Sequence, residues 1–201
     1  MNYKKIRDLA WNILIKNGVS ELPVNIYKIC KQEGINVFSY KVSESFIESM
    51  GLTEEAELND AFSMGNTIFY NEEKSEQRRR FSIAHELGHI LLHSDIEFKI
   101  YNREPLPCEL PIEAEANAFA ARILAPLCVL QFLNLNSARE ISEVCNISYT
   151  AAEARFSRLC EIRKRNKERR SEKNHGTFLL SRLERRVIEN FGEYIEKNKK
   201  S

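Results

Sequence analysis

The chain has 201 residues, of which 43% are hydrophobic and 29% charged, and its formal net charge is +1. This length and composition are typical of one main globular domain with an appendage, and they exclude a fibrous or intrinsically disordered chain. Charged residues interrupt the first ten positions, and no window reaches the roughly 18 apolar residues of a membrane span. Neither a signal peptide nor a membrane span is predicted, and we expect a cytoplasmic protein.

The five cysteines are an odd number, and no two of them form a Cys-x-x-Cys pair. They are Cys30, Cys108, Cys128, Cys145 and Cys160. Zinc knuckles and redox sites need closer spacing, so we interpret these residues as buried free thiols.

The first third of the chain predicts two helices followed by a small sheet. Apolar residues at helical spacing over residues 4–17 predict the first helix, and a second is expected from Pro23 to about Glu33. Residues 35–40 and 67–70 alternate apolar and polar side chains, which indicates short strands.

The middle of the chain predicts two longer helices with a loop between them. Residues 75–93 have a charged start and an apolar remainder with helical periodicity. Prolines then mark a loop, at Pro105, Pro107 and Pro111. An alanine-rich helix is expected over residues 112–124, ending before Pro126.

Residues 137–160 predict two short helices around Asn146, in the outline of a helix-turn-helix. The second helix offers few side chains that could contact DNA, namely Tyr149, Thr150, Ala151, Ala152, Glu153 and Arg155. We therefore favour packing or substrate docking over DNA reading for this pair.

The C-terminal tail is basic, whereas the body of the chain is acidic. Residues 155–201 carry 15 Lys/Arg against 7 Asp/Glu, and residues 1–154 carry 15 against 22. Residues 163–174 are almost wholly charged and predict a linker or a solvated helix, and an apolar stripe then predicts a terminal amphipathic helix. Because glutamates interrupt the basic residues, direct nucleic-acid binding is not the favoured interpretation.

The predicted helix at 75–93 contains the pattern His-Glu-Leu-Gly-His, with His85, Glu86 and His89. Two histidines four residues apart share one helix face, so both imidazoles can reach a single metal ion. The intervening Glu86 lies beside the metal, where it can accept a proton from water. Zn²⁺ activates water and polarises a carbonyl, so the pattern indicates a zinc hydrolase with Glu86 as its general base. The alternative is a pair of core histidines without a metal.

Catalytic zinc usually has three protein ligands, so a third is needed. His93 lies about 12 Å along the helix axis from His85, too far to share an ion. His175 lies in a charged stretch and is a weak candidate. A carboxylate on the helix at 112–124 remains, where Glu113 and Glu115 both stand among small apolar residues. Burying either carboxylate without a compensating charge would be costly, and a metal ion supplies that charge.

Residues 79–93 and 115–126 together resemble the ImmA/IrrE family of metallo-endopeptidases, and the resemblance extends over roughly residues 3–160. It implies His85, His89 and Glu115 as zinc ligands, with Glu86 catalytic. It also implies an α+β fold: a mostly helical, zincin-like metallopeptidase domain with a small sheet over residues 1–135. A helix-turn-helix-like segment at 136–162 and a charged linker with an amphipathic helix at 163–201 would follow.

Members of this family cleave a helix-turn-helix transcriptional repressor and thereby release a stress response or a mobile genetic element. The resemblance therefore implies a site-specific regulatory zinc endopeptidase with a protein substrate. The competing hypothesis is a non-catalytic, metal-stabilised regulator that binds a transcription factor or DNA through its C-terminal region.

Overall fold

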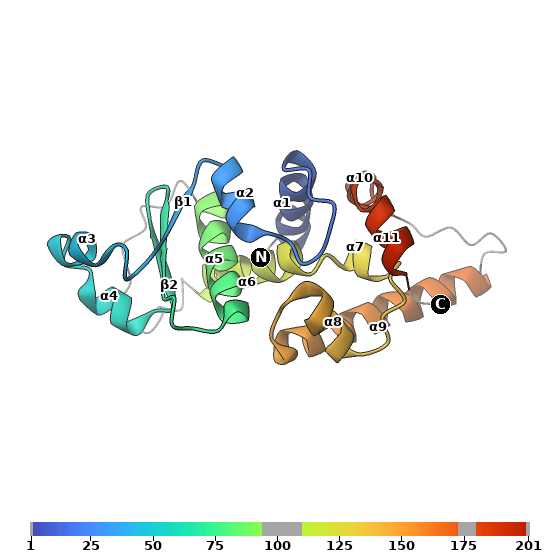
Figure 1. Cartoon of the computed structure of the whole chain (residues 1–201). Coiled ribbons are helices and arrows are strands. Elements are labelled where there is room, and N and C mark those ends of the chain that lie inside the picture. The colour runs from blue at the N-terminus through green and yellow to red at the C-terminus, as the bar shows by residue number, and fades with distance from the viewer. Residues whose placement is uncertain (1, 94–109, 173–179, 200–201) are drawn as a thin grey trace. The chain divides into compact units, whose positions relative to one another are not determined.

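The computed structural model describes residues 2–93, 110–172 and 180–199. The chain divides into two compact units. The first comprises Met1–Arg7 and Asn25–Leu124, and the second comprises Asp8–Val24 and Ala125–Ser201. Helices dominate both units and one small sheet lies in the first (Figure 1), which confirms the predicted α+β class. The predicted loop at Pro105 and Pro107 lies outside the described residues, as does Cys108.

The first unit contains the sheet and the helices around it. Its elements are α2 (Ile26–Gln32), β1 (Asn36–Ser39), α3 (Glu44–Ser49), α4 (Thr53–Leu58), β2 (Ala61–Met64), β3 (Thr67–Tyr70), α5 (Glu76–Leu92) and α6 (Leu110–Leu124). Helix α1 (Tyr3–Lys16) belongs in part to each unit.

The sheet has the strand order β1-β3-β2, with β3 parallel to β1 and antiparallel to β2. Gly65, at φ 56°, lies in the tight turn between β2 and β3. Successive residues of β3 point to opposite faces, and both Ile68 and Phe69 are buried, so both faces of the central strand are covered. Phe69 packs in a cluster with Ile47, Leu52 and Phe62, and Ala56 of α4 packs against this cluster. Helix α5 contacts β2 and β3. In Figure 1, α3 and α4 lie on one side of the strands and α5 lies on the other.

Helices α5 and α6 pack closely against each other at Gly88. A Cβ atom on Gly88 would lie 3.1 Å from Phe119 Cδ1, 3.2 Å from Ala116 Cα and 3.3 Å from Ala116 O. Glycine in a helix interior costs about 1 kcal/mol relative to alanine. The close approach of the α6 backbone explains why glycine is present here.

We expect Gly88→Ala to destabilise the first unit, because the added methyl group meets backbone atoms that cannot rotate away. Overpacking lowers the free energy of unfolding by about 1–3 kcal/mol. The higher helix propensity of alanine offsets part of this loss. Urea unfolding of the variant should therefore give a lower free energy of unfolding. Gly192→Ala is the matched control, since nothing lies within 4 Å of a Cβ there. Equal stability of the Gly88→Ala and wild-type chains would contradict this account of the packing.

The second unit is helical throughout its described residues. Its elements besides α1 are α7 (Leu127–Leu130), α8 (Ala138–Cys145), α9 (Tyr149–Glu172), α10 (Arg182–Asn190) and α11 (Gly192–Asn198). The helix pair predicted around Asn146 is present, and Asn146 ends α8 in the left-handed conformation at φ 48°. Arg155 donates through Nε to the carbonyl of Ala125 at 3.1 Å, so its guanidinium supports the fold of this unit.

Several predicted boundaries differ from the structure. Helix α2 begins at Ile26 instead of Pro23, because the Asn25 side chain caps it by accepting from Lys28 N at 3.0 Å. Helix α6 begins at Leu110 and takes Pro111 into its first turn, where a missing N–H is tolerated. Helix α9 continues to Glu172, so the charged stretch after residue 163 is helical, which is one of its two predicted alternatives. The terminal helix is divided into α10 and α11 at Phe191.

Three of the cysteines in the described residues, Cys30, Cys128 and Cys145, are buried free thiols as predicted, whereas Cys160 is exposed. Burial raises the pKa of the Cys30 thiol to about 12, which keeps it protonated and unreactive at neutral pH. Among the described helices, none combines the length and the apolarity that a membrane crossing requires.

Candidate metal centre

Helix α5 presents His85 and His89 on one face, one turn apart. Ser75 caps the start of this helix by accepting from Arg78 N at 3.3 Å. The two imidazole rings lie 4.6 Å apart between centroids, and their Nε2 atoms are 2.9 Å apart. His89 is buried and His85 is partly buried, with 4% and 16% of the side chains exposed. Their ring nitrogens therefore meet in a sheltered position, as the four-residue spacing predicted.

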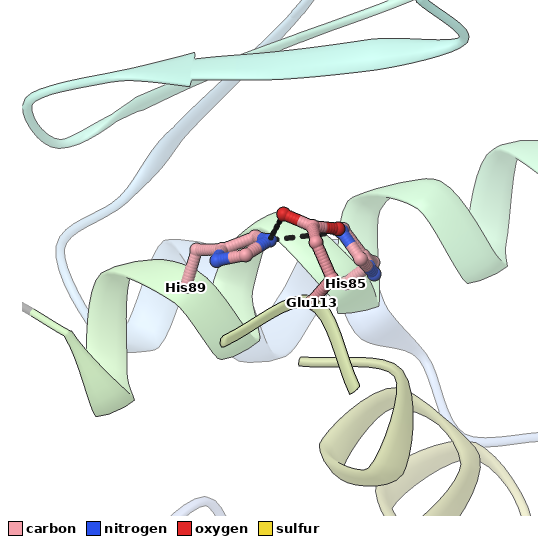
Figure 2. Close-up of side chains that lie close together, drawn as sticks. All are labelled: His85, His89 and Glu113. Carbon is pink, nitrogen blue, oxygen red and sulfur yellow. Dashed lines mark hydrogen bonds and ion pairs between the residues drawn. The ribbon is translucent and has the colours of Figure 1, made fainter. Parts of the chain in front are cut away.

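Glu113, near the start of α6, completes a group of three donors. Its Oε2 atom lies 3.2 Å from His85 Nε2 and its Oε1 atom lies 3.2 Å from His89 Nε2 (Figure 2). One ligand atom from each residue can be chosen so that all lie within 4.8 Å of one another. The close packing of α5 on α6 at Gly88 brings this carboxylate to the histidines.

The three residues fit a divalent zinc ion in both chemistry and spacing. Two imidazole nitrogens and one carboxylate are a common donor set of catalytic zinc. Bonds of about 2.1 Å in a tetrahedral arrangement place ligand atoms about 3.4 Å apart. The observed separations of 2.9, 3.2 and 3.2 Å are close to that value. No large rearrangement of the side chains is needed for them to hold one ion.

Asn117 sets the tautomer of His85. Its Oδ1 atom, one turn along α6 from Glu113, lies 3.0 Å from His85 Nδ1. An amide oxygen can only accept, so Nδ1 donates to Asn117, and Nε2 is the ring nitrogen that faces Glu113 and His89. Partners of this kind orient metal-binding histidines and raise their basicity. Sequence analysis missed Asn117, although its spacing of four from Glu113 places both on one helix face.

The carboxylates of Glu86 and Glu113 lie close to His85 and affect its pKa. Hydrogen bonds from His85 and His89 hold the pKa of Glu113 well below its usual range. Burial alone would lower the pKa of His85, but the hydrogen bond to Glu113 and the charge of Glu86 raise it above its ordinary value. The site is therefore electronegative and favours a cation or a proton at its centre.

Glu86 follows His85 on α5 and is not among the three grouped donors. Its Oε2 atom accepts a hydrogen bond of 2.7 Å from Ser63 Oγ on β2. Burial raises the pKa of Glu86 above its usual range, despite the nearby imidazoles, and a raised pKa suits a group that takes up and returns protons. Ser63 had no sequence signal, because β2 was not predicted.

The expectation that Glu115 faces the two histidines is not met. Its Oε2 atom lies 3.8 Å from His93 Nε2, and its Oε1 atom accepts from Asn2 N at 3.4 Å. Residues two apart on a helix point about 200° apart, so Glu113 and Glu115 cannot both face α5 in the same place. The structure instead brings Glu113 to the two histidines. The spacing in the sequence had left Glu113 open as the alternative to Glu115. His175 lies outside the described residues.

Comparison with known families supports a peptidase-type domain. Residues 30–157, more than half of the chain, match the model of the IrrE N-terminal-like domain, Peptidase_M78. The match includes the α5 and α6 residues that meet at this site, together with α8 and the first part of α9. No curated protein sequence matches the chain.

Proposed function

Since the chain belongs to the family of the IrrE N-terminal-like peptidase domain, we propose that it is a zinc-dependent endopeptidase with His85, His89 and Glu113 as ligands. The observation that carries this proposal is the meeting of three donor side chains beside Glu86, a carboxylate outside that group. Glu113 replaces Glu115 in the ligand set, because its two oxygens are the ones within 3.2 Å of the histidines.

Three residues beside the histidines have separate roles in the proposed peptide hydrolysis. A bound zinc ion would supply a Lewis acid that polarises the scissile carbonyl and activates water. Glu86 accepts the proton from the attacking water and returns it to the leaving amine. Asn117 keeps the Nε2 lone pair of His85 directed into the site. Glu113 supplies a carboxylate that stays ionised across the physiological range of pH.

The proposed substrate is a helix-turn-helix transcriptional repressor, and the proposed outcome is regulatory cleavage. Support comes from the resemblance of residues 79–93 and 115–126 to metallo-endopeptidases that cut such repressors. A repressor is met in the cytoplasm, so we place the reaction there. The alternative is a metal-stabilised regulator that binds a transcription factor or DNA through its C-terminal region without cutting it. It uses the same histidines and gives Glu86 no catalytic role.

Incubating the purified full chain with Zn²⁺ and helix-turn-helix repressors from the same organism tests this function. We expect discrete repressor fragments by mass spectrometry, no fragments after treatment with a chelator, and recovery when Zn²⁺ is added back. A stable complex with an intact repressor would favour the non-catalytic alternative. Cleavage that persists in the metal-free chain would contradict the zinc mechanism.

A further inference from the structure

Ser63 is directed toward α5 by the register of the sheet. It pairs with Ile68, whereas its neighbour Phe62 pairs with Phe69. Paired residues of adjacent strands point to the same face, and successive residues point to opposite faces. Phe62 and Phe69 lie in the cluster with Ile47 on the face toward α3 and α4. Ser63 therefore lies on the other face, the one toward α5.

On that face the Ser63 hydroxyl contacts the carboxylate of Glu86. Ser63 Oγ donates to Glu86 Oε2 at 2.7 Å, within the range of hydrogen bonds from hydroxyl groups to carboxylates. Such charge-assisted bonds are about twice as strong as neutral ones and restrict the carboxylate to one rotamer. One oxygen of Glu86 is thus held by the strand, and Oε1 takes no part in this bond.

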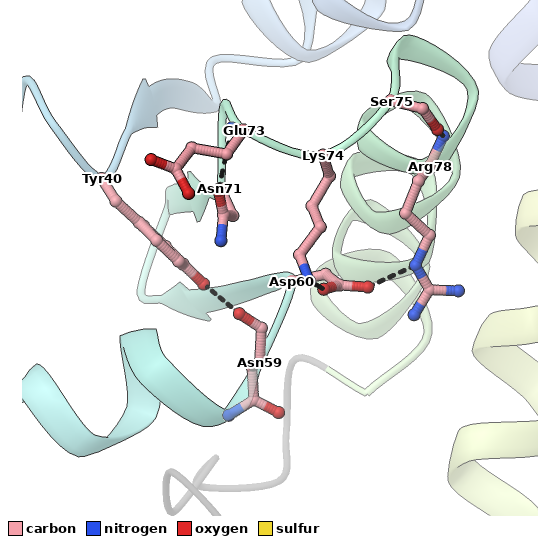
Figure 3. A network of polar contacts seen from close by, with 8 residues as sticks. All are labelled: Tyr40, Asn59, Asp60, Asn71, Glu73, Lys74, Ser75 and Arg78. Carbon is pink, nitrogen blue, oxygen red and sulfur yellow. Dashed lines mark hydrogen bonds and ion pairs between the residues drawn. The ribbon is translucent and has the colours of Figure 1, made fainter.

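The strand that carries Ser63 is itself fixed to the start of α5. Asp60, directly before β2, forms an ion pair with Lys74 Nζ at 3.0 Å and another with Arg78 Nε (Figure 3). Arg78 lies in the first turn of α5, the helix that carries Glu86. The carbonyl of Asp60 also accepts from Asn71 N at 2.9 Å. These contacts hold β2 against the helix and keep the hydroxyl at a fixed distance from the carboxylate.

We propose that Ser63 is a positioning residue for the peptidase reaction, in which its hydroxyl holds the Glu86 carboxylate in the orientation that accepts a proton from water. The inference rests on the proposed function, because it assigns Ser63 a role through Glu86. The three metal-binding side chains make no contact with Ser63 among the described hydrogen bonds. Loss of the hydroxyl should therefore affect Glu86 and leave metal binding unchanged.

The test uses zinc-loaded full chain and acetohydroxamate, a small chelator of zinc that also hydrogen-bonds to a carboxylate beside the metal. Ser63→Ala should weaken acetohydroxamate binding about tenfold, as expected for one hydrogen bond to a charged group. Its zinc affinity, measured by chelator competition, should stay within about twofold of wild type. Ser63→Thr keeps a hydroxyl and should restore binding. Ser49→Ala is the matched control, because Ser49 Oγ donates to the Phe46 carbonyl in α3.

Two binding results would overturn the proposal: unchanged acetohydroxamate binding by the Ser63→Ala variant, or failure of threonine to restore the binding. Crystal structures of the metal-free wild-type and Ser63→Ala chains give a second measurement that needs no zinc. We expect the Glu86 carboxylate to move or to adopt several rotamers in the variant. An unchanged Glu86 would also overturn the proposal. Failure of the proposed function is distinguishable, since the zinc-loaded wild-type chain would then leave the repressor uncut, while the crystal structures still test the contact between Ser63 and Glu86.

Discussion

Glu86→Gln is expected to abolish most peptide hydrolysis while the chain retains its zinc. Glutamine has the shape of glutamate and can still accept a hydrogen bond from Ser63 through its amide oxygen. It cannot accept the proton that water must lose. General acid–base catalysis contributes roughly 10² to 10⁴ to the rate, so kcat on the repressor should fall by about that factor. Zinc content by atomic absorption should match that of the wild-type chain.

Glu76→Gln is the matched control for this variant. It removes the same charge from the same helix at an exposed position in the first turn of α5. Cleavage by this control should be close to wild type. Continued cleavage by the Glu86→Gln variant would contradict the assigned role of Glu86. Loss of zinc from that variant would instead make Glu86 a metal ligand.

The part of the site on α5 was predictable because it depends only on residues that are close together in the sequence. The expected helix at 75–93 is observed as Glu76–Leu92, with Ser75 as its cap. On a single helix, a spacing of four residues is enough to place His85 and His89 on one face. Their Nε2 atoms do lie 2.9 Å apart.

The elements that support Glu86 were not predictable from the sequence, because they are short and depend on contacts between residues that are distant in the chain. Helices α3 and α4 have six residues each, and their buried residues are Ile47 in α3 and Glu55 in α4. Neither has room for an amphipathic pattern. Strand β2 has four residues and is stabilised by pairing with β3. Ser63 acquires its role only through that pairing.

The choice between Glu113 and Glu115 depends on how α6 is rotated against α5. Ala116 contacts Gly88, so it marks the side of α6 that faces α5. Helical geometry places Glu113 about 60° from Ala116 and Glu115 about 100° away on the opposite side. Spacing alone could not fix the rotation, and the resemblance favoured Glu115. Helix α6 carries several alanines, so the contact between Gly88 and Ala116 that fixes the rotation is known only from the structure.

Glu113→Gln and Glu115→Gln form a matched pair that tests this rotation directly. The Glu113 variant removes a charged donor 3.2 Å from both histidines, and we expect zinc affinity to fall by more than about 100-fold. The Glu115 variant removes a carboxylate that lies 3.8 Å from His93 instead, so its zinc affinity should stay within a few-fold of wild type. Competition with a chelator of known affinity measures both constants.

The reverse order of effects would mean that α6 presents Glu115 to the metal in the zinc-loaded chain. A similar loss in both variants would indicate that the charge around the site matters more than direct ligation. Glu113→Asp separates these explanations, because it keeps the charge and shortens the side chain by one methylene group. A ligand must reach the ion, so the aspartate variant should also lose zinc, whereas a purely electrostatic role would leave its affinity nearly intact.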